Sequence, residues 1–309
     1  RQVLVAAWLL VHLLLLGAVS NALLIWSWHF AQAILRVPPI TRRAEAIRLA
    51  LFNAGAVLVV VAVVLMQPWL VAVGGLLAIS ALLLHVVALV RALRSALPSR
   101  FAVAVHYYVA AALLAVPGIA LGVALTHQGT PALISAHAAI GLLGWVGLPI
   151  LGTLLTLWPT MLHTRIVDGA ERKARWALPA LIVGIGVVVA GLLIGVAPVA
   201  VAGVVLYGAA SGLIVAPMIA EMRRKPPRHF AAWSTLSGVV WLGAALVVFA
   251  ATIANPGGTV TVLALVGGVL QVLLGSLSYL VPVVMGGGPQ AVRWRNARAD
   301  RATSSRLKI

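Results

Sequence analysis

The stretch that decides the fold is "HLLLLGAVSNALLIWSWHF", which runs from His12 to Phe30. It is long and apolar enough to cross the hydrocarbon core of a bilayer as a helix, for which about 20 residues are needed. Yet it carries a histidine near each end, His12 and His29, and an asparagine between them. Polar side chains inside a membrane are costly unless they are paired, so these residues require partners elsewhere in the protein.

The composition extends the membrane assignment to the whole chain. Of its 309 residues, 63% are hydrophobic and 9% are charged, and the mean hydropathy is +1.12. Such a chain is predicted to be an all-α integral membrane protein. Cysteine is absent, which excludes disulfides, thiolate metal sites and cysteine-held iron–sulfur clusters. Nine transmembrane helices are expected near residues 3–35, 46–66, 70–93, 101–125, 132–162, 176–196, 199–222, 230–252 and 260–285.

The positive charge is confined to alternate loops. Every lysine and arginine except Arg1 follows the first, third, fifth, seventh or ninth helix, and Arg48 is assigned to the first of these basic loops. The positive-inside rule then predicts that these loops are cytoplasmic in a bacterial plasma membrane. Anionic lipids account for the net charge of +17, so nucleic acid is not an expected partner.

The two ends of the sequence suggest a piece of a longer protein. The same rule places Arg1 on the outside with no signal peptide before it, so we expect a further helix upstream. We divide the chain into a transmembrane domain, residues 1–285, and a basic cytoplasmic connector, residues 286–309.

A short motif recurs in the apolar segments. "GTLLTLWP" from Gly152 to Pro159 and "GSLSYLVP" from Gly275 to Pro282 match as G-[ST]-L-x-x-L-x-P, and "ALLIWSWH" from Ala22 to His29 is a looser counterpart. Each is followed by a basic loop. Helices one, five and nine are therefore predicted to begin equivalent four-helix units, related by rotation about the membrane normal.

Acidic residues are missing from the apolar segments, since all five lie in or beside basic loops: Glu45, Asp168, Glu171, Glu221 and Asp300. Proton-coupled transporters and cation carriers normally keep a carboxylate near the midplane, so this pattern disfavours them. No nucleotide-binding loop or hydrolase triad is present.

The histidines divide by depth. His12 and His137 enter the membrane several residues below the outer ends of helices one and five, where a neutral imidazole could ligate haem or bond to another helix. Gly141 and Gly144 share the face of His137 and would let a macrocycle or a neighbouring helix approach. His29, His85 and His106 lie on the inner side and are candidates for a second metal site, although interfacial anchoring also explains them.

Three four-helix units with outer histidines resemble the membrane fold of haem–copper oxidase subunit I, and "AHAAIGLLGWVGLPILGTLLTLWP", Ala136 to Pro159, is similar to the NnrS family of haem- and copper-containing membrane proteins. The resemblance implies that His12 is a haem ligand. Gln271 stands where the oxidases keep haem ligands, so a binuclear oxygen-reducing centre is not expected.

A closer resemblance is to the membrane region of actinobacterial multicopper-oxidase-domain proteins of the copper nitrite reductase type. It rests on "HLLLLGAVSNALLIWSWHFAQAILR", His12 to Arg36, and on "GGGPQAVR", Gly286 to Arg293. It implies a quinol-oxidising electron-transfer module with haem b held by His12 and His137. Electrons would pass to a cupredoxin-type copper domain on the external face, with the copper outside this chain. The alternatives are a structural anchor without cofactor and a transporter; whether the chain is a homo-oligomer is left open.

Overall fold

The structure is a computed structural model that describes residues 2–38, 42–253 and 258–287. Within these ranges the regular elements are all helices, and nine of the continuous helical segments are long and apolar enough to cross a membrane. This confirms the predicted all-α membrane class. We call the nine segments spans 1 to 9. The basic connector expected at residues 286–309 lies almost entirely outside the described residues.

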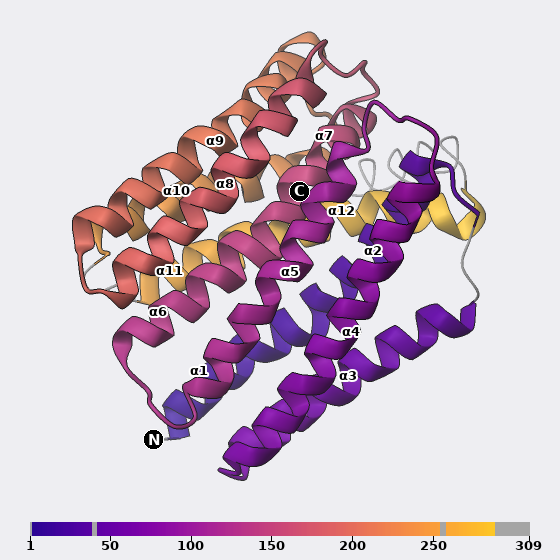
Figure 1. Ribbon diagram of the computed structural model, residues 1–309. Coiled ribbons are helices and arrows are strands. Elements are labelled where there is room, and N and C mark those ends of the chain that lie inside the picture. The colour runs from indigo at the N-terminus through magenta and orange to yellow at the C-terminus, as the bar shows by residue number, and fades with distance from the viewer. Residues whose placement is uncertain (1, 39–41, 254–257, 288–309) are drawn as a thin grey trace, which may run out of the picture. The chain divides into compact units, whose positions relative to one another are not determined.

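Six spans are single α-helices, whereas spans 1, 5 and 9 each change from α- to π-helix and back. The α-helices are labelled in Figure 1. Span 1 consists of α1 (Gln2–His12), η1 (Leu13–Val19) and α2 (Ser20–Leu35). Span 5 consists of α6 (Pro131–Ala139), η2 (Ile140–Gly147) and α7 (Leu148–Leu162). Span 9 consists of α11 (Gly258–Val262), η3 (Leu263–Leu270) and α12 (Gln271–Pro282), and is followed by η4 (Val283–Gly287). The others are α3 (Arg42–Val64), α4 (Pro68–Ser95), α5 (Val103–Ala124), α8 (Ala170–Leu193), α9 (Ala197–Arg224) and α10 (Phe230–Ala251).

Two helices extend further into the basic segments than hydropathy indicates. Helix α8 begins at Ala170, six residues before the expected start, and α3 begins at Arg42 rather than near residue 46. Glutamate, lysine and arginine are good helix formers, so a helix continues past the point where its apolar character ends. The assignment of Arg48 to a loop is therefore wrong: Arg48 lies inside α3 and is only 6% exposed.

The chain forms two compact units. The first contains Arg1–Thr156 and Asp168–Val215, and the second contains Leu157–Val167 and Ala216–Ile309. These units do not coincide with the expected four-helix repeats, because the first includes spans 1 to 4 together with span 6 and most of spans 5 and 7.

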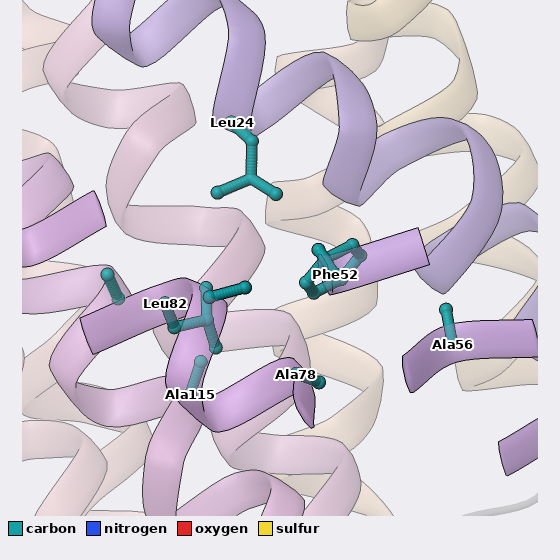
Figure 2. Packing of buried hydrophobic residues seen from close by; sticks show 8 residues of the cluster. Leu24, Phe52, Ala56, Ala78, Leu82 and Ala115 are labelled. Carbon is teal, nitrogen blue, oxygen red and sulfur yellow. The ribbon is translucent and has the colours of Figure 1, made fainter. Parts of the chain in front are cut away.

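The core of the first unit lies where spans 1 to 4 meet. Leu24 of α2, Phe52 of α3, Leu82 of α4 and Ala115 of α5 are buried against one another (Figure 2). Helices α3 and α4 approach closely at Gly55, where an added Cβ would lie 2.6 Å from the carbonyl oxygen of Gly74. Lipid offers no hydrophobic driving force between helices, so close packing of this kind supplies much of their association.

The basic loops of the first unit lie on one side of it. Ser99, after α4, donates a hydrogen bond to the carbonyl of Ile34 at the end of α2 (3.1 Å). Arg100 forms an ion pair with Glu171 of α8 (3.0 Å), and this hydrogen bond raises the pKa of Arg100 above its ordinary value. We call this side the basic side and the other the opposite side.

The basic segment of the second unit is also held by hydrogen bonds from charged side chains. Glu221 in the last turn of α9 accepts a hydrogen bond from the backbone N–H of Val167 (3.0 Å), and Lys225 donates to the carbonyl of His163 (3.0 Å). Glu221 is 2% exposed. Its place beside a basic loop agrees with the sequence, whereas its burial could not be read from it.

Candidate functional site

His12 and His137 come together in the first unit. The centroids of their imidazole rings are 6.3 Å apart, and the ring planes differ by only 11°. His12 is the last residue of α1, directly before η1, and His137 lies three residues before η2. His12 is ten residues from the start of α1, and His137 is six residues from the start of α6. Two histidines that are 125 residues apart thus lie side by side in the first unit.

Both rings are oriented by backbone carbonyls. Nδ1 of His12 lies 2.8 Å from the carbonyl oxygen of Trp8, and Nδ1 of His137 lies 2.8 Å from that of Gly118. A carbonyl can only accept, so each Nδ1 carries the proton. In a neutral imidazole the Nε2 atom is then unprotonated and has a lone pair to offer. Histidines that ligate metals in proteins are commonly oriented in this way.

The packing around the pair is tight on one side and open on another. The ring of His12 stacks on Trp8 with centroids 4.1 Å apart. The ring of His137 covers Gly122 of α5, where an added Cβ would lie 3.0 Å from Cε1 of the imidazole. Of the two glycines expected to face a macrocycle, Gly141 has no neighbouring atom within 4 Å of an added Cβ, whereas Gly144 packs on Leu114 of α5.

The pair is suited to haem more than to a bare metal ion. The two rings are stacked with centroids 6.3 Å apart, so the pair offers two nitrogen ligands at one place. A bare zinc or copper ion usually takes three or four protein ligands. In the described part of the chain no group of three or more His, Cys, Asp or Glu residues is placed to hold one. A haem iron needs only axial ligands from the protein, because the porphyrin supplies the other four.

The three inner histidines do not form a second cluster of this kind. His29 and His106 are exposed; His29 lies edge-on to Trp26, and Nδ1 of His106 donates to the carbonyl of Ala102 (3.0 Å). His85 is 2% exposed and contacts Ser27 and Arg48 instead. The structure therefore separates the candidates that depth alone had grouped.

The π-helices in spans 1, 5 and 9 were not expected from the sequence. A π-helix shifts backbone hydrogen bonding from i−4 to i−5 and is often found at functional sites. Segment η2 begins twelve residues before Gly152, and η3 begins twelve residues before Gly275. The G-[ST]-L-x-x-L-x-P motif thus keeps one register to the π-helix in spans 5 and 9. In span 1, η1 begins nine residues before Ala22, in agreement with a looser counterpart.

Side-chain donors satisfy carbonyls at the π-helices. Ser20 donates to the carbonyl of Leu15 in η1 (2.7 Å), and Tyr207 donates to that of Leu143 in η2 (2.9 Å). The indole N–H of Trp145, in η2, donates in turn to the hydroxyl of Ser20 (2.9 Å). Spans 1 and 5 are therefore joined by a hydrogen bond at their π-helices, below the histidine pair.

A second missed pair joins spans 1 and 2. The amides of Asn21 and Asn53 exchange hydrogen bonds of 3.0 and 2.8 Å, and each also donates to a carbonyl of its own helix, Gly17 and Leu49 respectively. This answers the question raised by the asparagine in the first apolar stretch: it has a reciprocal partner, which makes it a packing element.

The fold and the membrane-length helices together define an all-α, multi-pass membrane protein. No protein-family model, curated protein or solved structure matches the chain.

Proposed function

We propose that this protein is a membrane electron-transfer module that binds a b-type haem between His12 and His137. The observation that carries the proposal is the parallel pair of imidazoles, each with Nδ1 bonded to a carbonyl and Nε2 free. A haem bound there would supply one-electron transfer. The protein's own contribution is to hold both ligands in one tautomer, side by side, on two spans that are joined by the hydrogen bond from Trp145 to Ser20.

The surroundings of the pair support a redox role over an acid–base role. Arg48 is buried on the basic side of the first unit, and among the described residues neither imidazole takes part in an ion pair with a carboxylate. Trp8, stacked on His12, covers one ligand with an apolar ring.

The direction of electron flow follows from the resemblance and the charge pattern. With the basic loops in the cytoplasm of a bacterial plasma membrane, the histidine pair lies in the outer half of the bilayer. Quinol in the membrane is then the donor, and a cupredoxin-type copper domain of the nitrite reductase class on the external face is the acceptor. In this assignment the chain is an oxidoreductase component whose terminal chemistry takes place outside it.

The direct test is an optical difference spectrum, dithionite-reduced minus oxidised, of the purified protein after expression with adequate haem. Wild type should show the bands of a reduced six-coordinate b-type haem. His12→Ala and His137→Ala should each lower haem occupancy by about tenfold or more. His29→Ala is the matched control, since it removes an exposed histidine from the same span and should leave the spectrum unchanged.

Two results would count against the proposal. A wild-type protein without haem absorbance would leave the structural anchor as the better assignment. Haem that is retained in both His12→Ala and His137→Ala would show that its ligands lie elsewhere.

A further inference from the structure

Among the described residues, the basic half of the first unit contains a buried cation that no ion pair joins to an anion. Arg48 of α3 is 6% exposed, and its guanidinium carbon lies 5.0 Å from the ring centre of Trp28 on α2. Glu45 lies one turn earlier on α3, but the ion pairs among the described residues do not join it to Arg48. A buried charge of this kind is costly unless it is compensated.

Among the described residues, a single side-chain acceptor lies within hydrogen-bond distance of Arg48. Its Nη1 lies 3.4 Å from Nδ1 of His85, which therefore accepts. The other ring nitrogen of His85, Nε2, then carries the proton and donates to the hydroxyl of Ser27 (2.9 Å). A guanidinium has five N–H groups, and this arrangement uses one of them on a side-chain acceptor.

A second, independent hydrogen-bond donor beside Arg48 also lacks an acceptor. Trp28 is 3% exposed, and its indole Nε1 has no hydrogen-bond partner in the described part of the chain. Because the guanidinium covers the same indole, both donors belong to one cluster. Native proteins rarely leave a buried N–H unpaired, and such a group calls for an explanation, for example a bound ligand.

We propose that Arg48, Trp28 and His85 form a binding site for one oxyanion on the basic side. The guanidinium would supply the positive charge and two N–H donors, and Trp28 Nε1 would supply a third donor. The hydrogen bond between His85 and Ser27 would fix the imidazole, which in turn orients the guanidinium. Arg48 is six residues from the start of span 2 and Trp28 seven from the end of span 1, about 9–11 Å along each helix. This depth is within reach of the phosphate of an acidic lipid headgroup and of a free oxyanion entering from water.

The site is independent of the proposed haem, which involves the other half of spans 1 and 5. It also differs from a general attraction of basic loops for anionic lipid, because it predicts one anion per chain that depends on a single buried arginine. Arg43 provides the comparison, since it lies one and a half turns earlier on the same helix and is exposed.

The test uses the full chain, purified in a neutral detergent, and has two arms. Phosphatidylglycerol is titrated in one arm and bound lipids are counted by native mass spectrometry; phosphatidylcholine serves as the zwitterionic control. Inorganic phosphate is titrated in the other arm by isothermal calorimetry. We expect one tight anion per chain in at least one arm, and the arm that responds identifies the source as lipid or as free oxyanion.

The variants decide whether the site is the one described. Arg48→Gln should weaken binding by about 10- to 100-fold, as expected for charged hydrogen bonds. Arg43→Gln should bind as wild type does. Trp28→Phe keeps the ring and removes only the N–H, so it should fold normally and weaken binding by about three- to tenfold even if Arg48→Gln fails to fold.

Three outcomes would overturn the site. They are the absence of a tight anion in both arms, equal binding by wild type and Trp28→Phe, and equal losses in Arg43→Gln and Arg48→Gln. The haem spectrum of Trp28→Phe should be that of wild type, so the two proposals can fail separately.

Discussion

Histidine has different roles in the two halves of the first unit. In the opposite half, Nδ1 of His12 and of His137 each donates a hydrogen bond to a backbone carbonyl, and Nε2 is left free. In the basic half, His85 uses both of its nitrogens, one as acceptor from Arg48 and one as donor to Ser27. A histidine with a free nitrogen can ligate a metal, whereas one with both nitrogens occupied is a structural connector. Hydrogen bonding, more than residue type or depth, thus separates a candidate ligand from a packing residue.

The largest effect we expect comes from removing the connector. His85→Ala deletes a buried side chain and leaves Arg48 and Ser27 with one partner fewer, so the free energy of unfolding should fall by about 2–3 kcal/mol. The haem bands should persist. Thermal unfolding in detergent, followed by circular dichroism, measures the first effect, and the optical spectrum measures the second. His106→Ala, which removes an exposed histidine, is the control for stability.

Next in size is a test of the open face beside His137. Gly141→Leu adds a side chain where nothing lies within 4 Å, so the protein without haem should keep its thermal stability. If the macrocycle occupies that face, haem occupancy should fall by about tenfold, a loss of about 1.4 kcal/mol. Gly243→Leu on α10, also with open space around it, should change neither quantity. Unchanged haem in Gly141→Leu would place the macrocycle away from this face.

The amide pair between spans 1 and 2 lies between the two halves and should matter less. Asn53→Ala leaves Asn21 without its reciprocal partner and should lower the free energy of unfolding by about 1 kcal/mol, the upper part of the range for polar pairs between membrane helices. A double-mutant cycle with Asn21→Ala isolates the coupling. A coupling energy near zero would show that the pair contributes nothing to the contact of these helices.

The smallest effect concerns the hydrogen bond at the π-helices. Trp145→Phe removes the N–H that donates to Ser20 and keeps most of the packing, so stability should fall by about 0.6 kcal/mol. Haem retention should fall only slightly, because the ligands themselves are untouched. A loss of haem as large as that in His137→Ala would mean that the link at the π-helices positions the pair. The change is measured by thermal unfolding together with the optical spectrum, with Trp69→Phe, at an exposed tryptophan, as control.

Several features of the fold could be predicted because they depend on local composition. A segment of about 20 apolar residues has to form a helix in a bilayer, since no other local structure satisfies its backbone there. The nine helices follow from this. Their ends do not, because charged helix formers at 42–48 and 170–175 extend the helix without adding hydropathy.

The candidate site was predictable only in part. Depth and a recurring motif pointed to His12 and His137, and the structure brings these two side by side. The same reasoning grouped His85 with His29 and His106, which the structure separates. Depth is a function of position along the chain, whereas the face on which a side chain lies depends on the rotation of its helix against neighbours.

The sequence by itself determined the class of protein, the number of its apolar helices, the side on which its basic loops gather and the depth of each histidine. Each of these properties depends only on the composition of a continuous segment or on a residue's position along one helix. Only the tertiary structure decided which imidazoles face each other, that Arg48 is buried against Trp28, and that three spans contain π-helices. Each of these depends on how helices far apart in the chain are rotated and packed against one another. The partners of a side chain come from other helices, so they cannot be predicted from its neighbours in the sequence.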